Sequence, residues 1–282
     1  MTTTFRLTTI QDAVSIATVL TQSWFRGHSQ VVKALTPRVF RLEFDDEILR
    51  AFRPRVELDT IERFKQDAPT LTDGTLPKED DYLAWLCLMQ HYRVPTRLLD
   101  WTENVLTALY FVVSEKQNVD GELWAMLPLA LNKDSGVGYA APLLGNNPIL
   151  EYLLREIYWA GTPAALAAEL KLPDAQRRPI ALLPRRNFSR MVAQRSVFTL
   201  HPRPDTGHSI PEVLTDPKHL VRYIVPANDK RQLMADLDRL GINYQSLFPD
   251  LEGLARQIVY ENRIVGYGAP DPPQCSGPVA PS

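Results

Sequence analysis

The stretch that most constrains the fold runs from Gln90 to Tyr110 and reads QHYRVPTRLLDWTENVLTALY. Just before it, apolar residues recur at i, i+3, i+4 and i+7, namely Tyr82, Trp85, Leu86 and Met89. This spacing is typical of an amphipathic helix. Val94 precedes Pro95, and the residue before a proline is disfavoured in helical geometry. We therefore predict that the helix ends near Tyr92 and that the chain breaks there.

After the break we expect a short strand over Thr96–Leu99 and then a second helix, with Thr102 as its N-cap. The apolar face of that helix is predicted to contain Leu106, Leu109, Tyr110 and Val113. The break also contains Arg97, Asp100, Trp101 and Thr102, residue types that build sites more often than cores. We predict that this turn and residues 24–28 (WFRGH) line one pocket.

The rest of the chain alternates short strand and helix patterns without a regular βαβ repeat. A helix is expected from Thr8 or Thr9, and strands at 23–26, 122–127, 180–183, 196–200 and 219–225. Further helices are expected at 43–52, 148–159, 163–170, 187–194, 229–240 and 250–262, with loops at 129–147 and 202–218. We predict an α+β fold, a single compact domain over residues 1–265 with a mixed sheet core flanked by helices. Residues 266–282, rich in proline, are expected to be a disordered tail.

Charge and cysteine content narrow the class of protein. Lys+Arg 31 against Asp+Glu 33 leaves a formal charge of −2, which argues against a bulk polyanion binder but permits a local basic patch. The two cysteines lie far apart, in a helical run and in the tail, so no framework disulfide is expected. The N-terminus lacks a signal-peptide pattern, and no apolar run has the length of a membrane span. We therefore expect a cytoplasmic protein that does not contact membranes.

Common catalytic and metal-binding signatures are missing. Neither a G-x-G-x-x-G nor a G-x-x-x-x-G-K-[ST] loop occurs, and there is no G-x-S-x-G elbow and no zinc spacing. The five histidines are scattered, and we predict no metal site. Metal-dependent hydrolysis by His28 and His91 is kept as an alternative that a chelator would test.

Arg26 lies on a predicted strand after two aromatic residues and before Gly27, which permits a turn or the close approach of a ligand. One interpretation is structural, with Arg26 or Arg97 forming an ion pair with Asp100. The other is functional: the guanidinium binds a phosphate or ribose of a nucleotide, since a buried arginine needs an anionic partner. Nearby aromatic residues could stack on a base or simply belong to the core: Trp24, Phe25, Tyr92 and Trp101.

Three segments carry a family resemblance: WFRGHSQ, LMQHYRVPTRLLDWTENVLTALYFVVS and RMVAQRSVFTLH. Together they resemble the FRG domain, a family named after the Phe-Arg-Gly motif that is Phe25-Arg26-Gly27 here. The resemblance spans roughly residues 10–260. One local departure is Arg93, where the family usually has glycine. The resemblance identifies a family more firmly than an activity.

A more distant similarity is to mono-ADP-ribosyltransferases of the Arg-Ser-Glu type. Phe25-Arg26-Gly27 is similar to their NAD-binding arginine strand, and Pro95–Leu98 leading into Ala108–Phe111 is similar to their second element. Gln194–Phe198 resembles the third, in the same order along the chain. The transferases carry a catalytic glutamate where this chain has Ser196. The missing carboxylate would have to come from elsewhere, and Asp100 and Glu103 are the nearest candidates in the sequence.

The resemblance implies NAD as a substrate and assigns roles by position. Catalytic roles are expected for Arg26, for Asp100 as stabiliser of an oxocarbenium-like state, and for Gln194 as the residue that orients the acceptor. The NAD-binding residues are expected to be Arg26, Gly27, His28, His91, Tyr92, Thr96, Arg97 and Trp101. A toxin or phage-defence effector of this kind would have a nucleic-acid or protein acceptor and a regulatory partner such as an antitoxin.

A final feature is the run between Arg177 and Arg195, which holds six arginines and no acidic residue. It can be a solvated basic face, or it can contact pyrophosphate or a nucleic acid. Together with Ser196, it supports a second function hypothesis, a non-catalytic module that senses nucleotides or binds nucleic acid.

Overall fold

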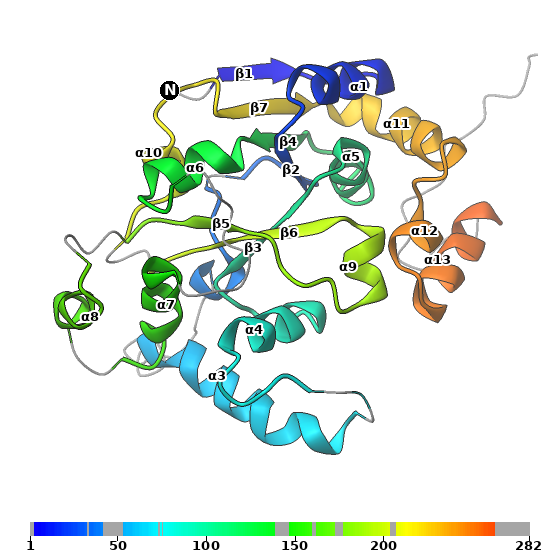
Figure 1. The fold of residues 1–282 in the computed structure, drawn as a ribbon. Coiled ribbons are helices and arrows are strands. Elements are labelled where there is room, and N and C mark those ends of the chain that lie inside the picture. Colours follow the sequence, from blue (N-terminus) through cyan, green and yellow to red (C-terminus); the bar gives the residue numbers. More distant parts are fainter. Residues whose placement is uncertain are drawn as a thin grey trace, which may run out of the picture.

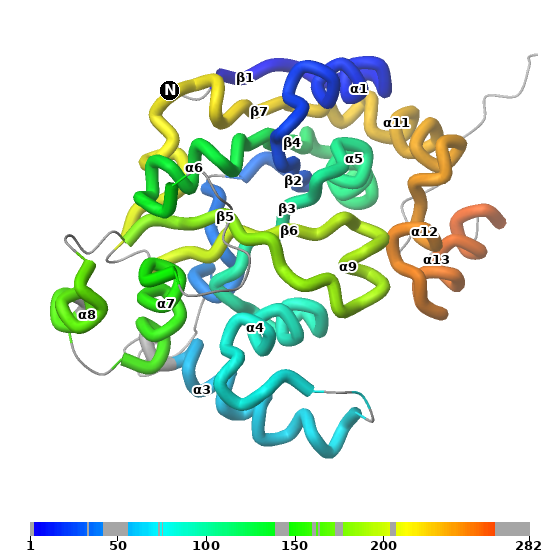
Figure 2. Tube along the Cα trace, viewed as in Figure 1, coloured from blue at the N-terminus to red at the C-terminus, as the bar shows by residue number. Residues whose placement is uncertain are grey.

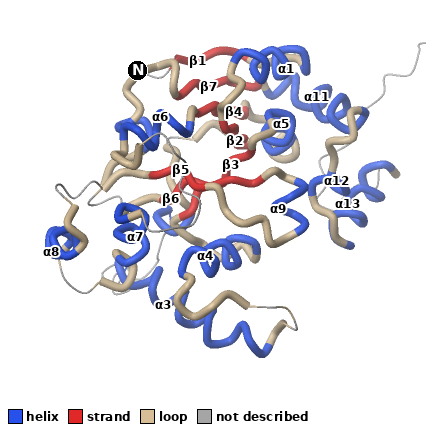
Figure 3. The backbone as a smooth tube through the Cα atoms, in the orientation of Figure 1, coloured by secondary structure: helices blue, strands red, loops and turns tan. Residues whose placement is uncertain are grey.

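The computed structural model describes residues 3–32, 34–41, 53–72, 74, 76–138, 147–159, 162–172, 177–203 and 207–262. Figures 1 and 2 trace the chain, and Figure 3 marks the helices and strands. Seven strands form one sheet in the order β1-β7-β4-β2-β3-β6-β5. They are β1 (Thr3–Arg6), β2 (Trp24–His28), β3 (Leu98–Thr102), β4 (Gly121–Met126), β5 (Ile180–Leu182), β6 (Ser196–Leu200) and β7 (Leu220–Val225).

Helices pack on both faces of this sheet. The first half of the chain contributes α1 (Ile10–Val19), η1 (Arg38–Arg41), α3 (Arg53–Asp67), η2 (Ala68–Thr70), α4 (Tyr82–His91), α5 (Val105–Val113) and α6 (Pro128–Asp134). The second half contributes α7 (Pro148–Arg155), α8 (Pro163–Glu169), α9 (Ser189–Ala193), α10 (Ile210–Val213), α11 (Ala227–Arg239), α12 (Tyr244–Leu247) and α13 (Leu251–Glu261). Only β1 and β7 pair in parallel within the described sheet, so the mixed sheet and its helices confirm the predicted α+β class.

The buried core consists of three clusters, two on one face of the sheet and one on the other. Successive residues of a strand contribute to opposite faces. Phe25 packs with α1, α5 and α11, and Leu98 packs with α3, α4 and α7. Phe25 and Thr102 are opposite one another, and Leu98 is four residues before Thr102, so these two clusters lie on the same face. Trp24 and Leu99 point the other way, into a cluster that includes α6 and α10. The helices of the first two clusters leave space between them over the middle of the sheet.

Most predicted boundaries around the central stretch are confirmed. Helix α4 has Tyr92 as its C-cap, β6 spans Ser196–Leu200 as predicted, and Asp250 caps α13. Thr9 caps α1 through a capping box with Asp12. These boundaries agree with the predictions because prolines and capping residues act on the residues next to them.

Other predictions are wrong. Thr102 is the last residue of β3, and Asn104 caps α5 instead, because the Thr102 hydroxyl is used to hold β3 to the turn before β6. The predicted loop from 129 begins with α6, and the loop from 202 contains α10. Strand β1 had no signal, since all four of its residues are exposed and carry no apolar alternation. The helix predicted over 43–52 and the tail at 266–282 lie outside the described residues.

Gly27 is required by packing between β2 and α5. A Cβ atom at this position would lie 2.0 Å from the carbonyl oxygen of Ala108, a backbone atom that cannot swing aside. Gly27 has no left-handed backbone angle. The glycine therefore lets helix α5 approach the strand, and its predicted role in admitting a ligand is not needed to explain it.

Gly27→Ala is expected to destabilise the fold by about 3 kcal/mol, because the added methyl group pushes α5 away from the sheet. Urea unfolding measures the loss. Gly138→Ala is the control: its Cβ would meet no atom within 4 Å, and its φ of 89° predicts only a strain cost of about 1 kcal/mol. Equal losses in the two variants would contradict the packing explanation.

Candidate functional site

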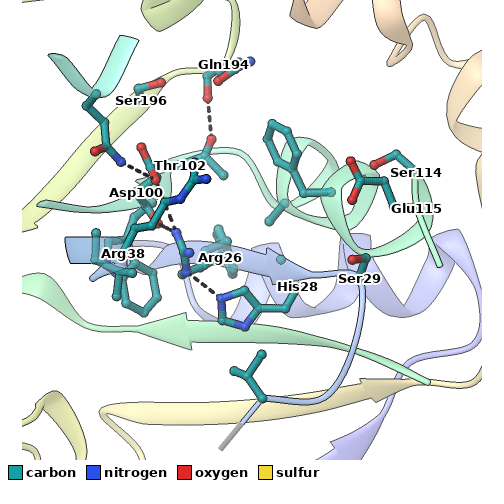
Figure 4. Close-up of a pocket in the computed structure, with 18 of the residues that line it drawn as sticks. Arg26, His28, Ser29, Arg38, Asp100, Thr102, Ser114, Glu115, Gln194 and Ser196 are labelled. Carbon is teal, nitrogen blue, oxygen red and sulfur yellow. Dashed lines mark hydrogen bonds and ion pairs between the residues drawn. The ribbon is translucent and has the colours of Figure 1, made fainter. Parts of the chain in front are cut away.

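A cavity of about 550 Å³ lies over the sheet, between helices α4 and α5. Its lining comes from β2, β3, β6, η1, the end of α4, α5 and α9. Figure 4 shows Arg26, Arg38 and Asp100 together on one side and Ser29, Ser114 and Glu115 on the other. Gln194 and Ser196 lie above them in this view. The predicted pocket therefore exists, and residues 25–28 and Asp100 both line it.

The cavity lies where the sheet opens between β2 and β3. Among the described residues, these strands share one register pair, Phe25 with Thr102, whereas β2–β4 and β3–β6 each share five. Arg26 fills the opening: its NH1 donates to the carbonyl oxygen of Asp100 at 2.5 Å. That oxygen belongs to the part of β3 that β2 does not pair with. The Asp100 carbonyl oxygen is thus paired with the Arg26 side chain instead of with a backbone amide of β2. Arg26 also lines the cavity.

Arg26 is oriented by a hydrogen-bonded chain that crosses β2 and β4. Its Nε donates to His28 Nε2 at 2.8 Å, so His28 carries its proton on Nδ1 and donates it to Glu122 Oε1 at 3.0 Å. Glu122 is fully buried and also accepts from Arg222 Nε at 2.8 Å and from the Val32 amide. This arrangement needs a neutral imidazole, because a doubly protonated ring could not accept from Arg26.

The pKa of His28 is lowered to about 4, chiefly by burial and by the Arg26 charge, while Glu122 acts in the opposite direction. His28 is therefore neutral at pH 7. Since the unfolded value is 6.5, the folded state binds fewer protons between the two values. The stability that this contributes is fully present above pH 6.5 and is lost as the pH falls towards 4.

We expect His28→Gln to reduce this loss of stability at acid pH. A glutamine amide can accept from Arg26 and donate to Glu122, but it does not titrate. Between pH 6.5 and 4 the wild-type protein should lose on the order of 3 kcal/mol of unfolding free energy more than the variant does. Denaturant unfolding across this pH range measures the difference. His201, whose pKa burial lowers to about 3, stays in both proteins and provides the common background. Parallel pH profiles would contradict the assignment.

Asp100 is the carboxylate closest to Arg26. Its Oδ2 lies 3.7 Å from Arg26 NH1 and accepts from Gln90 Nε2 at 2.8 Å, and 54% of its side chain is exposed. The Thr96 hydroxyl donates to Gln90 Oε1 at 2.6 Å and thereby fixes the direction of the amide. Asp100 is thus held from two sides, with one face of the carboxylate open to the cavity. The structural interpretation of an Arg26–Asp100 ion pair is confirmed, and Arg97 has no part in it.

Further arginines surround this carboxylate. Arg38, Arg41, Arg93 and Arg190 also line the cavity. Burial lowers the pKa of Arg41 and of Arg190; the neighbouring charges of Arg38 and Arg93 act in the same direction, and Asp100 opposes both shifts. The cavity is therefore a positive pocket built around one exposed carboxylate.

Three other predicted site residues reach the lining, but each is engaged with the protein itself. Trp101 is 3% exposed, and its indole N–H donates to Thr199. The Gln194 amide donates to the carbonyl oxygen of Leu247 in α12 at 3.0 Å. A buried amide held in this way does not fit the predicted role of orienting an acceptor. Gly27 packs against α5.

The remaining predicted NAD-binding residues lie outside the cavity lining. His91 stacks on Phe188 with ring centroids 4.4 Å apart, and Tyr92 lines a neighbouring, more apolar cavity of about 840 Å³. Thr96 is fully buried and acts through Gln90. Arg97 is fully buried and forms ion pairs with Glu57 and Glu156, so its guanidinium is not available to a ligand. His28 and His91 do not converge, and among the described residues no group of metal-ligating side chains is present.

The arginine run at 177–195 does not form one surface. Arg178 donates to the Asp134 carbonyl oxygen, Arg186 pairs with Glu103, and Arg190 lies over the Phe248 ring at 4.6 Å. Of these six arginines, only Arg190 lines the 550 Å³ cavity, which we call the arginine cavity. Glu103 is occupied by Arg186 and is no substitute for a catalytic carboxylate.

Several residues of the site were not predicted. Arg38 and Arg41 had no sequence signal, since they lie in a segment without clear periodicity. Gln90 and Glu122 had one: each is a polar residue in an otherwise apolar run, a pattern that points to a buried polar contact. Arg93 adopts a left-handed φ of 63°, which explains why glycine suits this position.

Comparison with known proteins identifies the first part of the chain. Residues 21–121 match the family model of the FRG domain, which includes β2, the α4–β3 turn and α5. The match is narrower than the predicted span of 10–260 and leaves out β6. No curated protein and no solved structure matches the chain. Within the described part of the chain, no helix combines the length and apolar character needed to cross a membrane.

Proposed function

We propose that this FRG-domain protein binds NAD in the arginine cavity and transfers its ADP-ribose to an acceptor. The observation that carries the proposal is Asp100: a half-exposed carboxylate held by Gln90 and Arg26 in a pocket whose lining includes five arginines. Such a pocket suits a ligand with both negative phosphates and a site of developing positive charge.

The pyrophosphate is assigned to Arg26 and Arg190. Arg26 has its Nε bound to His28 and one NH1 hydrogen bound to Asp100, which leaves three guanidinium hydrogens for a ligand. Arg190 is held over the ring of Phe248. Arginine binds phosphate through several parallel hydrogen bonds, and these two side chains are pre-oriented by their neighbours. The cavity volume of about 550 Å³ is in the usual range for ligand pockets.

Asp100 acts at the chemical step. The bond between ribose C1′ and the nicotinamide nitrogen breaks, and its electron pair leaves with nicotinamide. An O–H or N–H group of the acceptor then forms a bond to C1′ and releases its proton to water. C1′ passes through an oxocarbenium-like state, and a nearby carboxylate stabilises the positive charge that develops.

The order of the elements supports the same proposal. The three segments that resemble the transferases lie on β2, β3 and β6, which are neighbours in the sheet. Ser196 opens β6 opposite Thr102 and lines the cavity, so the carboxylate expected there is missing while the position itself faces the site. That serine favours the second candidate, a nucleotide-sensing module without turnover. A toxin or phage-defence role and an antitoxin-like partner stay predictions of the resemblance.

The test uses NAD labelled in the nicotinamide ring. The protein is incubated with it, released nicotinamide is quantified, and NAD binding is measured by calorimetry. Arg26→Lys keeps the charge but loses the fork, and it should weaken NAD binding by about tenfold to a hundredfold, the effect of a lost charged hydrogen bond. Arg239→Lys, at an exposed helix end, is the matched control. Binding without release would favour the non-catalytic module, and no NAD binding would exclude the transferase.

A further inference from the structure

The arginine cavity carries more positive charge than NAD needs. Six of its described lining residues are cations and two are carboxylates, Asp100 and Glu115, an excess of four. The whole chain has a net charge of −2, so this excess is local. The pyrophosphate of one NAD molecule supplies two negative charges. A second polyanionic ligand would balance the rest, and this step rests on the proposed function.

The surplus lies on an exposed rim made of Arg38, Arg41 and Arg93. All three side chains are exposed, and no carboxylate of the described residues lies within 4.0 Å of their guanidinium groups. Arg38 NH1 donates to the Arg93 carbonyl oxygen, which ties η1 to the turn after α4. Partial burial and the charge of Arg38 lower the pKa of Arg41, so the cluster repels itself when no anion is bound. Clustered arginines of this kind bind successive phosphates.

An exposed aromatic ring adjoins the rim. Tyr92 precedes Arg93, is 60% exposed, and packs edge-on against His91 with centroids 5.0 Å apart. It opens onto the neighbouring apolar cavity, which shares Val94 with the arginine cavity. Exposed aromatic rings beside arginines are the usual platform for unpaired bases.

We propose that the acceptor of this site is a single-stranded nucleic acid, with its phosphates on Arg38, Arg41 and Arg93 and a base stacked on Tyr92. The acceptor group on a neighbouring nucleotide enters the cavity and bonds to C1′ as nicotinamide leaves. A cavity of about 550 Å³ is the size of a small-ligand pocket and excludes a duplex, so only an unpaired nucleotide could reach C1′. A protein acceptor would require neither the rim charge nor the stacking surface.

The first experiment measures binding without NAD. Fluorescence anisotropy is recorded with short labelled single strands of RNA and DNA and with the matching duplex, over a range of salt concentrations. The variant Arg38→Gln/Arg41→Gln/Arg93→Gln should bind single strands at least tenfold more weakly. Its salt slope should fall by about 0.7 for each phosphate that no longer meets an arginine. The control replaces three exposed arginines that do not line the cavity, Arg63, Arg231 and Arg239, and should match the wild type.

A second variant guards against misfolding of the triple substitution. Tyr92→Ser removes only an exposed ring and should weaken single-strand binding by about five- to a hundredfold, the effect of one stacked base. Circular dichroism verifies the fold of each variant. Absent oligonucleotide binding, equal binding by rim and control variants, or a preference for duplex would overturn the proposal.

The second experiment separates this proposal from the proposed function. NAD labelled in the adenylate moiety is added with oligonucleotides or with a protein extract, and labelled product is located by size. Label on the single strand supports the proposal, and label on protein alone overturns it. Single-strand binding without nicotinamide release would leave the rim assignment standing and remove the transferase. Nicotinamide release with no binding of nucleic acid would do the reverse.

Discussion

Asp100→Asn is expected to lower nicotinamide release by about 10²- to 10³-fold, the usual effect of removing one group that stabilises a transition-state charge. The amide oxygen can still accept from Gln90, so the local geometry is preserved while the charge is lost. NAD binding should change little or become tighter, because a negative charge is removed beside Arg26, to which we assign the pyrophosphate. The loss should therefore appear in kcat and not in KM.

The control is Glu115→Gln, since Glu115 is the other carboxylate in the described lining and lies across the cavity in Figure 4. It should retain near wild-type turnover. A second arm adds Ser196→Glu to Asp100→Asn, which places a carboxylate on β6 where the transferases have theirs. Partial recovery of release is expected. Unchanged turnover in Asp100→Asn with an intact fold would mean that this carboxylate only holds Arg26 in place.

Arg97→Leu is expected to destabilise the protein by about 3–5 kcal/mol, because it leaves two buried glutamates without their counter-charge. Arg97 Nε and NH2 donate to the two oxygens of Glu57 at 2.8 and 2.6 Å, and NH1 donates to Glu156 and to the Leu153 carbonyl oxygen, each at 2.9 Å. These charges raise the pKa of Arg97 despite its burial. The one side chain joins α3, α7 and the strand β3 that carries Asp100.

Urea unfolding measures the loss, with Arg155→Leu as the control. Arg155 also pairs with two glutamates, Glu151 and Glu169, but these pairs lie at the surface and should contribute little. Replacing Glu57 and Glu156 by leucine together with Arg97→Leu should restore most of the stability, because no unpaired charge is then buried. Similar losses in Arg97→Leu and Arg155→Leu would show that the buried triad is not special.

The different environments of Arg26 and Arg97 could not be predicted from the sequence. Both are arginines on or next to short strands, and the resemblance predicts that both bind NAD. Their environments differ because of residues far away in the chain: Glu57 and Glu156 enclose Arg97, whereas His28, Glu122 and the Asp100 carbonyl oxygen orient Arg26 towards the cavity. Spacing along one strand cannot distinguish these outcomes.

Local chemistry was readable from the sequence because its causes lie within a few residues. Pro95 ended α4, Asp250 capped α13, and β6 ended before His201-Pro202. Gln90, Arg93 and Asp100 of the central stretch line the same pocket as Phe25-Arg26-Gly27, as predicted, whereas Tyr92 and Arg97 do not. What only the tertiary structure decided is the charge of that pocket. Arg38, Arg41 and Arg190 reach it from η1 and α9, and Gly27 faces a helix rather than a ligand, because these contacts depend on how strands β2 and β3 separate.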